Sequence, residues 1–77
     1  MTKKELLATF NLTLDDTDGR NYDGLCAFLV EYGIATDGEI ELIANINGAT
    51  VESLLDIVYC RCGLRSIEQL INEYKDQ

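Results

Sequence analysis

Three copies of a helix-start motif divide this sequence into short helical segments. In this motif a Ser or Thr side chain accepts a hydrogen bond from the backbone three residues later, and a Glu or Gln at that position reaches back to the cap residue. The copies are Thr2-x-x-Glu5, Thr36-x-x-Glu39 and Ser66-x-x-Gln69. Because apolar residues at helical spacing follow each copy, the sequence predicts helices that begin after residues 2, 36 and 66.

Two further helices are predicted from apolar residues that repeat every three or four positions. Each of these stripes ends near a glycine, which favours the backbone conformation that closes a helix. The first stripe is Leu25, Phe28, Leu29 and Tyr32, before Gly33; the second is Val51, Leu54, Leu55, Val58 and Cys62, between Thr50 and Gly63. The sequence therefore predicts an all-α fold, a compact bundle of four to five short helices.

Residues 10–14 carry a strand-like pattern. Phe10, Leu12 and Leu14 alternate with polar residues, as in a half-buried strand. No second strand is evident to pair with this segment, so we expect a frayed helix end or an extended segment packed on the bundle. The composition of the next segment, residues 15–24, predicts a solvated, turn-rich loop.

The length of 77 residues predicts one small helical domain, residues 1–77. No apolar run approaches the roughly 20 residues that span a bilayer, and residues 1–10 lack the apolar region of a signal peptide. Cys26, Cys60 and Cys62 are expected to be reduced thiols. These features predict a cytoplasmic protein that does not enter the membrane.

The acidic residues are unevenly placed along the chain. The formal net charge is −8, from fourteen acids and six bases. Between Arg20 and Arg61 lie forty residues with no base and seven acids: Asp23, Glu31, Asp37, Glu39, Glu41, Glu52 and Asp56. Such a block repels phosphate and anionic lipid, and it attracts basic surfaces.

The stretch ELIANINGATVESLLDIVY, residues 41–59, has the spacing of a helix-turn-helix. Ala44 is small enough to let a second helix approach, and Gly48 can supply the positive φ of the turn. Leu54 and Ile57 would hold the second helix on the first. The stretch resembles the generic helix-turn-helix superfamily, which implies a corner between two helices and, as an alternative function, a DNA-binding regulator.

The charge of the second helix argues against DNA reading. This helix would present Val51, Glu52, Ser53 and Asp56 to the major groove, and residues 37–59 contain five acids and no base. Phosphate contacts come from Lys, Arg and backbone amides, and they supply most of the non-specific affinity. Direct nucleic-acid binding is therefore the weaker alternative.

Catalytic, metal and cofactor sites have little support. The sequence has no histidine and no Gly-rich phosphate loop, so we expect no enzymatic activity and no cofactor. Residues 15–24 fit neither register of an EF-hand loop, and Cys60 and Cys62 would diverge on a helix, so no metal site is predicted. Residues 52–59 resemble the second-helix start of acyl carrier proteins; that resemblance implies phosphopantetheine on Ser53 and is a further alternative.

Binding through the surface is the remaining prediction. Carboxylates along helices attract a basic partner and speed its encounter. We predict a small acidic protein-binding module, an inhibitor or adaptor for a protein with a basic, nucleic-acid-binding surface. The predicted partner-binding residues are Glu39, Glu41, Glu52, Asp56 and Tyr59.

The short length, acidic composition and opening residues of the chain suggest where such a module would act. A short acidic sequence that opens with MTKKE resembles small open reading frames of phages and mobile elements of Gram-positive bacteria. Some of these proteins inhibit host defence nucleases, and they include anti-CRISPR proteins, so the resemblance implies a nuclease partner in the host cytoplasm. Four tyrosines are many for so small a core, so a homodimer that uses Tyr59 is a second binding hypothesis.

Overall fold

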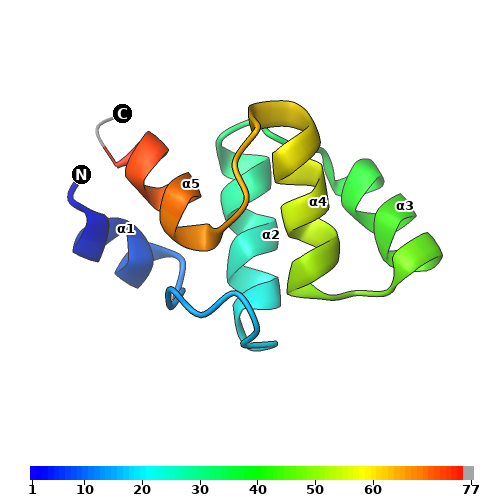
Figure 1. Cartoon of the computed structure of the whole chain (residues 1–77), viewed down its shortest axis with the longest axis horizontal. Helices are drawn as coiled ribbons and strands as arrows, with labels where there is room; N and C mark the ends of the chain where they lie inside the picture. The colour runs from blue at the N-terminus through cyan, green and yellow to red at the C-terminus, as the bar shows by residue number, and fades with distance from the viewer. Residues whose placement is uncertain (76–77) are drawn as a thin grey trace.

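The computed structural model describes residues 1–75, which form five α-helices (Figure 1). The helices are α1 (Lys3–Thr9), α2 (Asn21–Glu31), α3 (Asp37–Asn47), α4 (Val51–Cys62) and α5 (Ile67–Tyr74). No strand forms within residues 1–75. The predicted all-α bundle of short helices is confirmed.

The predicted cap residues begin their helices. Thr2 and Thr36 each form a complete capping box with the glutamate three residues later. Ser66 accepts the backbone N–H of Gln69 at 3.1 Å. The Gln69 side chain accepts the backbone N–H of Arg65 at 2.7 Å, one residue before the cap. The local hydrogen-bonding pattern therefore sets all three helix starts.

The strand-like alternation after α1 belongs to a helix end. The N–H of Leu12 donates to the carbonyl of Leu7 at 2.9 Å, and the N–H of Asn11 donates to that of Ala8 at 3.2 Å. Asn11 is left-handed, with φ 53°, which completes the hydrogen-bond pattern of a Schellman motif. This turn buries Leu12 and leaves Leu14 exposed.

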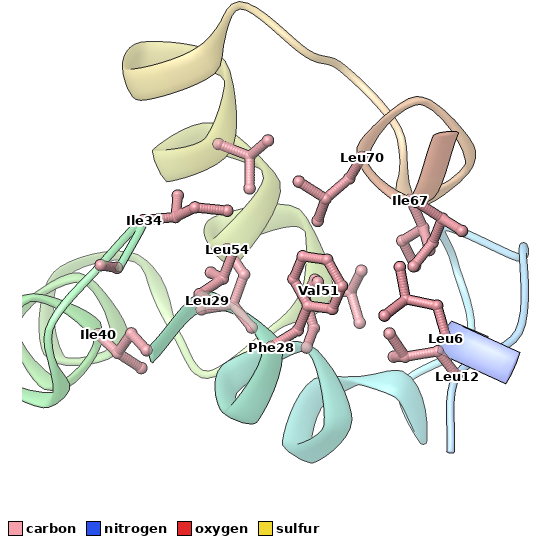
Figure 2. Packing of buried hydrophobic residues seen from close by; sticks show 14 residues of the cluster. Leu6, Leu12, Phe28, Leu29, Ile34, Ile40, Val51, Leu54, Ile67 and Leu70 are labelled. Atoms are coloured by element: carbon pink, nitrogen blue, oxygen red, sulfur yellow. The ribbon is translucent and has the colours of Figure 1, made fainter. Parts of the chain in front are cut away.

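The core lies between α2 and α4, which pack against each other in the middle of the bundle (Figure 1). Helices α1 and α5 pack together on one side, and α3 lies on the other. Side chains from all five helices meet in the interior (Figure 2). The buried apolar residues are Leu6, Leu12, Leu25, Phe28, Leu29, Ile34, Ala35, Ile40, Val51, Leu54, Val58, Ile67, Leu70 and Ile71.

Aromatic side chains pack at one edge of this core. The ring of Tyr32 lies 4.7 Å from that of Phe28 and 5.0 Å from that of Tyr74, measured between centroids. Tyr22 is also half-buried against the core. Tyr59 differs, because 49% of it remains exposed. Of the four tyrosines, Tyr59 is therefore the one whose ring the core leaves exposed.

A helix-turn-helix-like corner joins α3 to α4 through residues 48–50. Gly48 has φ 97° and ψ 152°, a conformation that side-chain-bearing residues rarely adopt. Ala44 and Ile57 are half-buried and Leu54 is fully buried, as the corner requires. The predicted corner is confirmed. Ile40 is the one residue of α3 that is buried.

The loop after α1 is tied to the bundle by buried polar contacts. The Asn21 side chain, which is 1% exposed, accepts the N–H of Thr13 at 3.0 Å and donates to the carbonyl of Asp15 at 3.0 Å. Asp16 accepts the N–H of Ile67, the first residue of α5, at 2.8 Å. These contacts hold residues 16–19 beside the first turn of α4.

The longest helix, α4, has 12 residues, whereas a membrane-spanning helix needs about 20. Among residues 1–75, no helix combines the length and apolar character required to cross a membrane.

Candidate functional site

Three of the predicted partner-binding residues lie together on the exposed side of α4. Glu52, Asp56 and Tyr59 are four and three residues apart, so the helical repeat places them on one face. All three are exposed. The opposite face of α4 is fixed by the burial of Leu54 and Val58 in the core.

A shallow groove of about 380 Å³ runs along this face. It is lined by Glu52, Leu55, Asp56, Tyr59 and Arg65. The groove thus combines two carboxylates, an aliphatic side chain, an aromatic ring and one guanidinium. Of these residue types, tyrosine and arginine are enriched in surfaces that bind another protein, whereas glutamate and aspartate are not.

Arg65 comes from the loop between α4 and α5 and occupies the Tyr59 end of the groove. Its guanidinium carbon lies 4.8 Å from the centre of the Tyr59 ring. Its Nη2 donates a hydrogen bond of 3.1 Å to the Tyr59 hydroxyl. Gly63, in the left-handed conformation with φ 74°, ends α4 and starts the loop that carries Arg65 back to this position.

In the part of the chain that the structure describes, the two carboxylates of the groove have no cationic partner. Within residues 1–75 the ion pairs are Lys3–Glu68 at 3.0 Å, Arg20–Asp18 at 2.9 Å and Arg61–Glu39. Glu52 and Asp56 take part in none of them, and Arg65 contacts Tyr59 instead. Their charge therefore remains available to a molecule that enters the groove.

The predicted site residues of α3 lie apart from this groove. Glu39 is half-buried at the start of α3, where it completes the capping box and pairs with Arg61. Arg61 also donates to the carbonyl of Ile34 at 3.3 Å, which links α4 to the chain before α3. Glu41 is exposed but does not line the groove. The structure therefore assigns Glu39 a structural contact and leaves Glu41 on a separate surface.

A second groove continues from the first toward the loop after α1. It has a volume of about 330 Å³ and is lined by Asp16, Thr17, Gly19, Ala49, Thr50, Val51 and Glu52. Because Glu52 lines both grooves, they adjoin each other at this residue, and the two together are called the path along α4 below. Asp16 adds a third carboxylate, and no Lys or Arg lines this second part.

Two residues that line these grooves, Asp16 and Arg65, could not be predicted as site residues from the sequence. Asp16 is 36 positions from Glu52 and reaches α4 because the loop is anchored on α5. Arg65 follows a helix-closing glycine, and this position predicts a helix end but no particular contact. Both depend on tertiary contacts that local patterns do not encode.

Two of the positions considered for a DNA-reading helix are not on the surface. Val51 and Ser53 are each 4% exposed, because the first turn of α4 packs on the bundle. The Ser53 hydroxyl lies 3.1 Å from that of Thr50, the cap residue. A prosthetic group on Ser53 would need this buried hydroxyl to reach solvent.

The cysteines form no cluster. Cys26, Cys60 and Cys62 are free thiols, and burial raises the pKa of Cys26 above that of an ordinary thiol. Among residues 1–75 no three His, Cys, Asp or Glu side chains are grouped closely enough to hold a metal ion.

Comparison with known proteins adds no relative from which a function could be transferred. No protein-family model matches the sequence, and neither the curated proteins nor the solved structures contain a match. The function must therefore be argued from the surface of the molecule.

Proposed function

We propose that this protein is a small acidic protein-binding module, which acts as an inhibitor or adaptor on a partner with a basic surface. One observation carries the proposal: Glu52 and Asp56, which form no ion pair within residues 1–75, lie in a groove beside the exposed ring of Tyr59. This arrangement joins attraction for cations with an aromatic contact residue on a rigid helix. No catalytic step is part of the proposal.

Charge supports a protein partner over nucleic acid or anionic lipid. The chain has a net charge of −8, and the path along α4 carries three carboxylates, from Asp16, Glu52 and Asp56. Electrostatic complementarity raises the rate of encounter with a basic surface and disfavours partners of like charge. A partner that reads phosphate with its own basic groove, such as a host defence nuclease, fits this chemistry.

The resemblance to small phage and mobile-element proteins supports the inhibitor role. An acidic helix that occupies a phosphate-binding surface would compete with the nucleic acid directly. We place this action in the cytoplasm, or in the host cytoplasm for a phage-encoded chain, where the three free thiols would stay reduced.

Charge reversal in the groove tests the proposal. The variant Glu52→Lys with Asp56→Lys should lose basic partners in a pull-down at low salt, read by quantitative mass spectrometry, because like charges repel. The matched control reverses Glu31 and Glu73, which are exposed and lie outside both grooves. Circular dichroism checks that both variants fold.

The control variant changes the net charge by the same amount, so it separates a local site from a general charge effect. We expect it to retain most of the partner. Equal capture by the groove variant and the wild type, with the fold intact, would contradict the proposal.

A helix-turn-helix DNA-binding regulator is the second candidate, favoured by the corner between α3 and α4. The side of α4 that would face DNA exposes the carboxylates of Glu52 and Asp56 rather than lysine or arginine side chains. This function predicts a mobility shift of duplex DNA at low salt that weakens steeply as salt rises. We expect no such shift.

Self-association is supported by a different surface from the one predicted. Leu42 and Ile46, one turn apart on α3, are 61% and 68% exposed. Two exposed aliphatic side chains could be covered in a homodimer, and sedimentation of the wild type beside a Leu42→Ser, Ile46→Ser variant would reveal it. The nearby Glu41 would oppose close contact between two copies.

A further inference from the structure

We infer that the groove on α4 accepts an arginine side chain of the partner, and that Arg65 occupies this position in the unbound protein. The inference rests on the proposed function, because it specifies the chemistry of the basic partner. The partner element is an arginine-rich segment that lies along α4 and displaces the Arg65 side chain.

The ring of Tyr59 already serves as a guanidinium-binding surface. The Arg65 guanidinium carbon is 4.8 Å from the ring centre, and its Nη2 donates to the phenol oxygen at 3.1 Å. A planar guanidinium stacks on an aromatic face and is weakly hydrated, whereas a lysine ammonium is a compact and strongly hydrated charge. Tyr59 therefore favours arginine over lysine.

Arg65 contacts the Tyr59 ring but neither of the carboxylates in the groove. It forms no ion pair with Glu52 or Asp56, although all three line the same groove. An arginine that approaches from a partner is not restricted by the short loop that holds Arg65. It can contact the Tyr59 ring and a carboxylate together, which adds charge-assisted hydrogen bonds that Arg65 does not make.

The rest of the path offers room for more than one arginine. Glu52 lines both the first groove and the second, which has a volume of about 330 Å³ and is lined by Asp16 but by no Lys or Arg. Glu52 and Asp56 are separated by about 6 Å along the helix axis, from four residues at the α-helical rise. A segment with arginines at neighbouring turns would therefore meet carboxylates along α4.

Two synthetic peptides of equal charge test the inference. One is a 12-residue helical peptide with four arginines on one face, and the other has lysine at the same four positions. Fluorescence anisotropy of the labelled peptides measures affinity for the full chain at low salt. We expect the arginine peptide to bind about 2- to 5-fold more tightly, the range of a cation–π contact at an exposed ring.

Variants of Tyr59 and Arg65 locate the effect. Tyr59→Leu should reduce the preference for arginine to less than about twofold, because the aromatic face is lost. Arg65→Ala should strengthen binding of the arginine peptide by about 2- to 5-fold, because no internal guanidinium competes for the exposed ring. Lys4→Ala is the matched control, since Lys4 is exposed, forms no ion pair in residues 1–75 and carries the same charge.

The outcomes separate this inference from the proposed function. Equal affinity for the two peptides, or an effect of Arg65→Ala no larger than that of Lys4→Ala, would overturn the inference. If both peptides then still lose affinity on Glu52→Gln with Asp56→Asn, basic-partner binding stands without arginine selectivity. If neither peptide binds and charge reversal leaves the pull-down unchanged, both proposals fail.

Discussion

Asn21 shows how one buried polar residue can organise a long connection. Its side chain is 1% exposed, and it bonds to Thr13 at both the backbone and the hydroxyl, the latter at 2.9 Å, as well as to the carbonyl of Asp15. A buried amide is stable when its donors and acceptors are all paired. Among residues 1–75, no buried side-chain nitrogen or oxygen lacks a partner. The loop is thereby fixed in one position, and with it Asp16 beside α4.

Removal of the Asn21 side chain should therefore destabilise the fold. Asn21→Ala leaves the N–H of Thr13 and the carbonyl of Asp15 without their partner, which costs about 2–4 kcal/mol in the free energy of unfolding. Urea denaturation measures the change. Asn45→Ala on exposed α3 is the control and should alter stability by less than about 0.5 kcal/mol. Equal effects of the two substitutions would show that the Asn21 contacts contribute nothing.

At the scale of the element, one face of α4 packs on the core and the other presents the proposed binding residues. Leu54 and Val58 anchor the helix on α2 and the core, which holds Glu52, Asp56 and Tyr59 at fixed spacing on the other side. A surface carried by a packed helix is rigid, so little conformational entropy is lost when a partner binds. Helix α3 is less deeply anchored than α4, since Ile40, 7% exposed, is its one buried residue.

The close approach of α2 to Phe10, the residue that follows α1, gives a prediction at the same scale. A Cβ atom on Gly24 of α2 would lie 2.1 Å from the carbonyl oxygen of Phe10, so Gly24→Ala must push the end of α1 away. We expect a loss of about 2 kcal/mol or more in the free energy of unfolding.

Gly38 supplies the matched control for this substitution. A Cβ atom there meets nothing closer than 3.9 Å, at Thr36, and Gly38 is an exposed helical position. Gly38→Ala should stabilise the protein by about 0.5–1 kcal/mol. Thermal unfolding of both variants tests the pair, and tolerance of alanine at position 24 would show that the close approach is not a constraint.

At the scale of the whole molecule, excess negative charge opposes the compact state. Fourteen acids face six bases, and residues 1–75 contain three ion pairs, all at least partly exposed. Exposed ion pairs contribute about 0–1 kcal/mol each, whereas self-repulsion acts among all the acids.

Salt should therefore stabilise this protein. Between about 10 mM and 150 mM NaCl the screening length falls from roughly 30 Å to 8 Å, which weakens the repulsion more than it weakens three short-range pairs. We expect the melting temperature to rise over this range, as measured by circular dichroism. A fall in melting temperature would show that the ion pairs outweigh the repulsion.

Four of the five helix starts could be predicted from the sequence because their signals are local. The start of α2 could not, because the composition of residues 15–24 predicts a loop, whereas α2 begins at Asn21, after Arg20, which forms no side-chain cap hydrogen bond. Thr2, Thr36, Thr50 and Ser66 begin helices as their patterns indicate, and Gly63 ends one. Capping and helical periodicity involve residues within a few positions of each other, so neighbours in the chain determine them. The exposed stripe of Glu52, Asp56 and Tyr59 follows from the same periodicity.

The composition of the groove depended on contacts between distant residues. The pairing of Glu39 with Arg61, 22 positions apart, withdraws one predicted binding residue from the acidic surface, and the sequence shows these two residues as separate features. Asp16 reaches α4 through an anchor on Ile67, 51 positions away.

The sequence by itself therefore determined an acidic all-α chain with its caps, turns and helix faces. The tertiary structure decided which acids stay without a partner and which share a groove with Tyr59 and Arg65. The physical reason is that helix formation depends on hydrogen bonds between near neighbours, whereas a binding surface depends on how separate helices and loops pack in three dimensions.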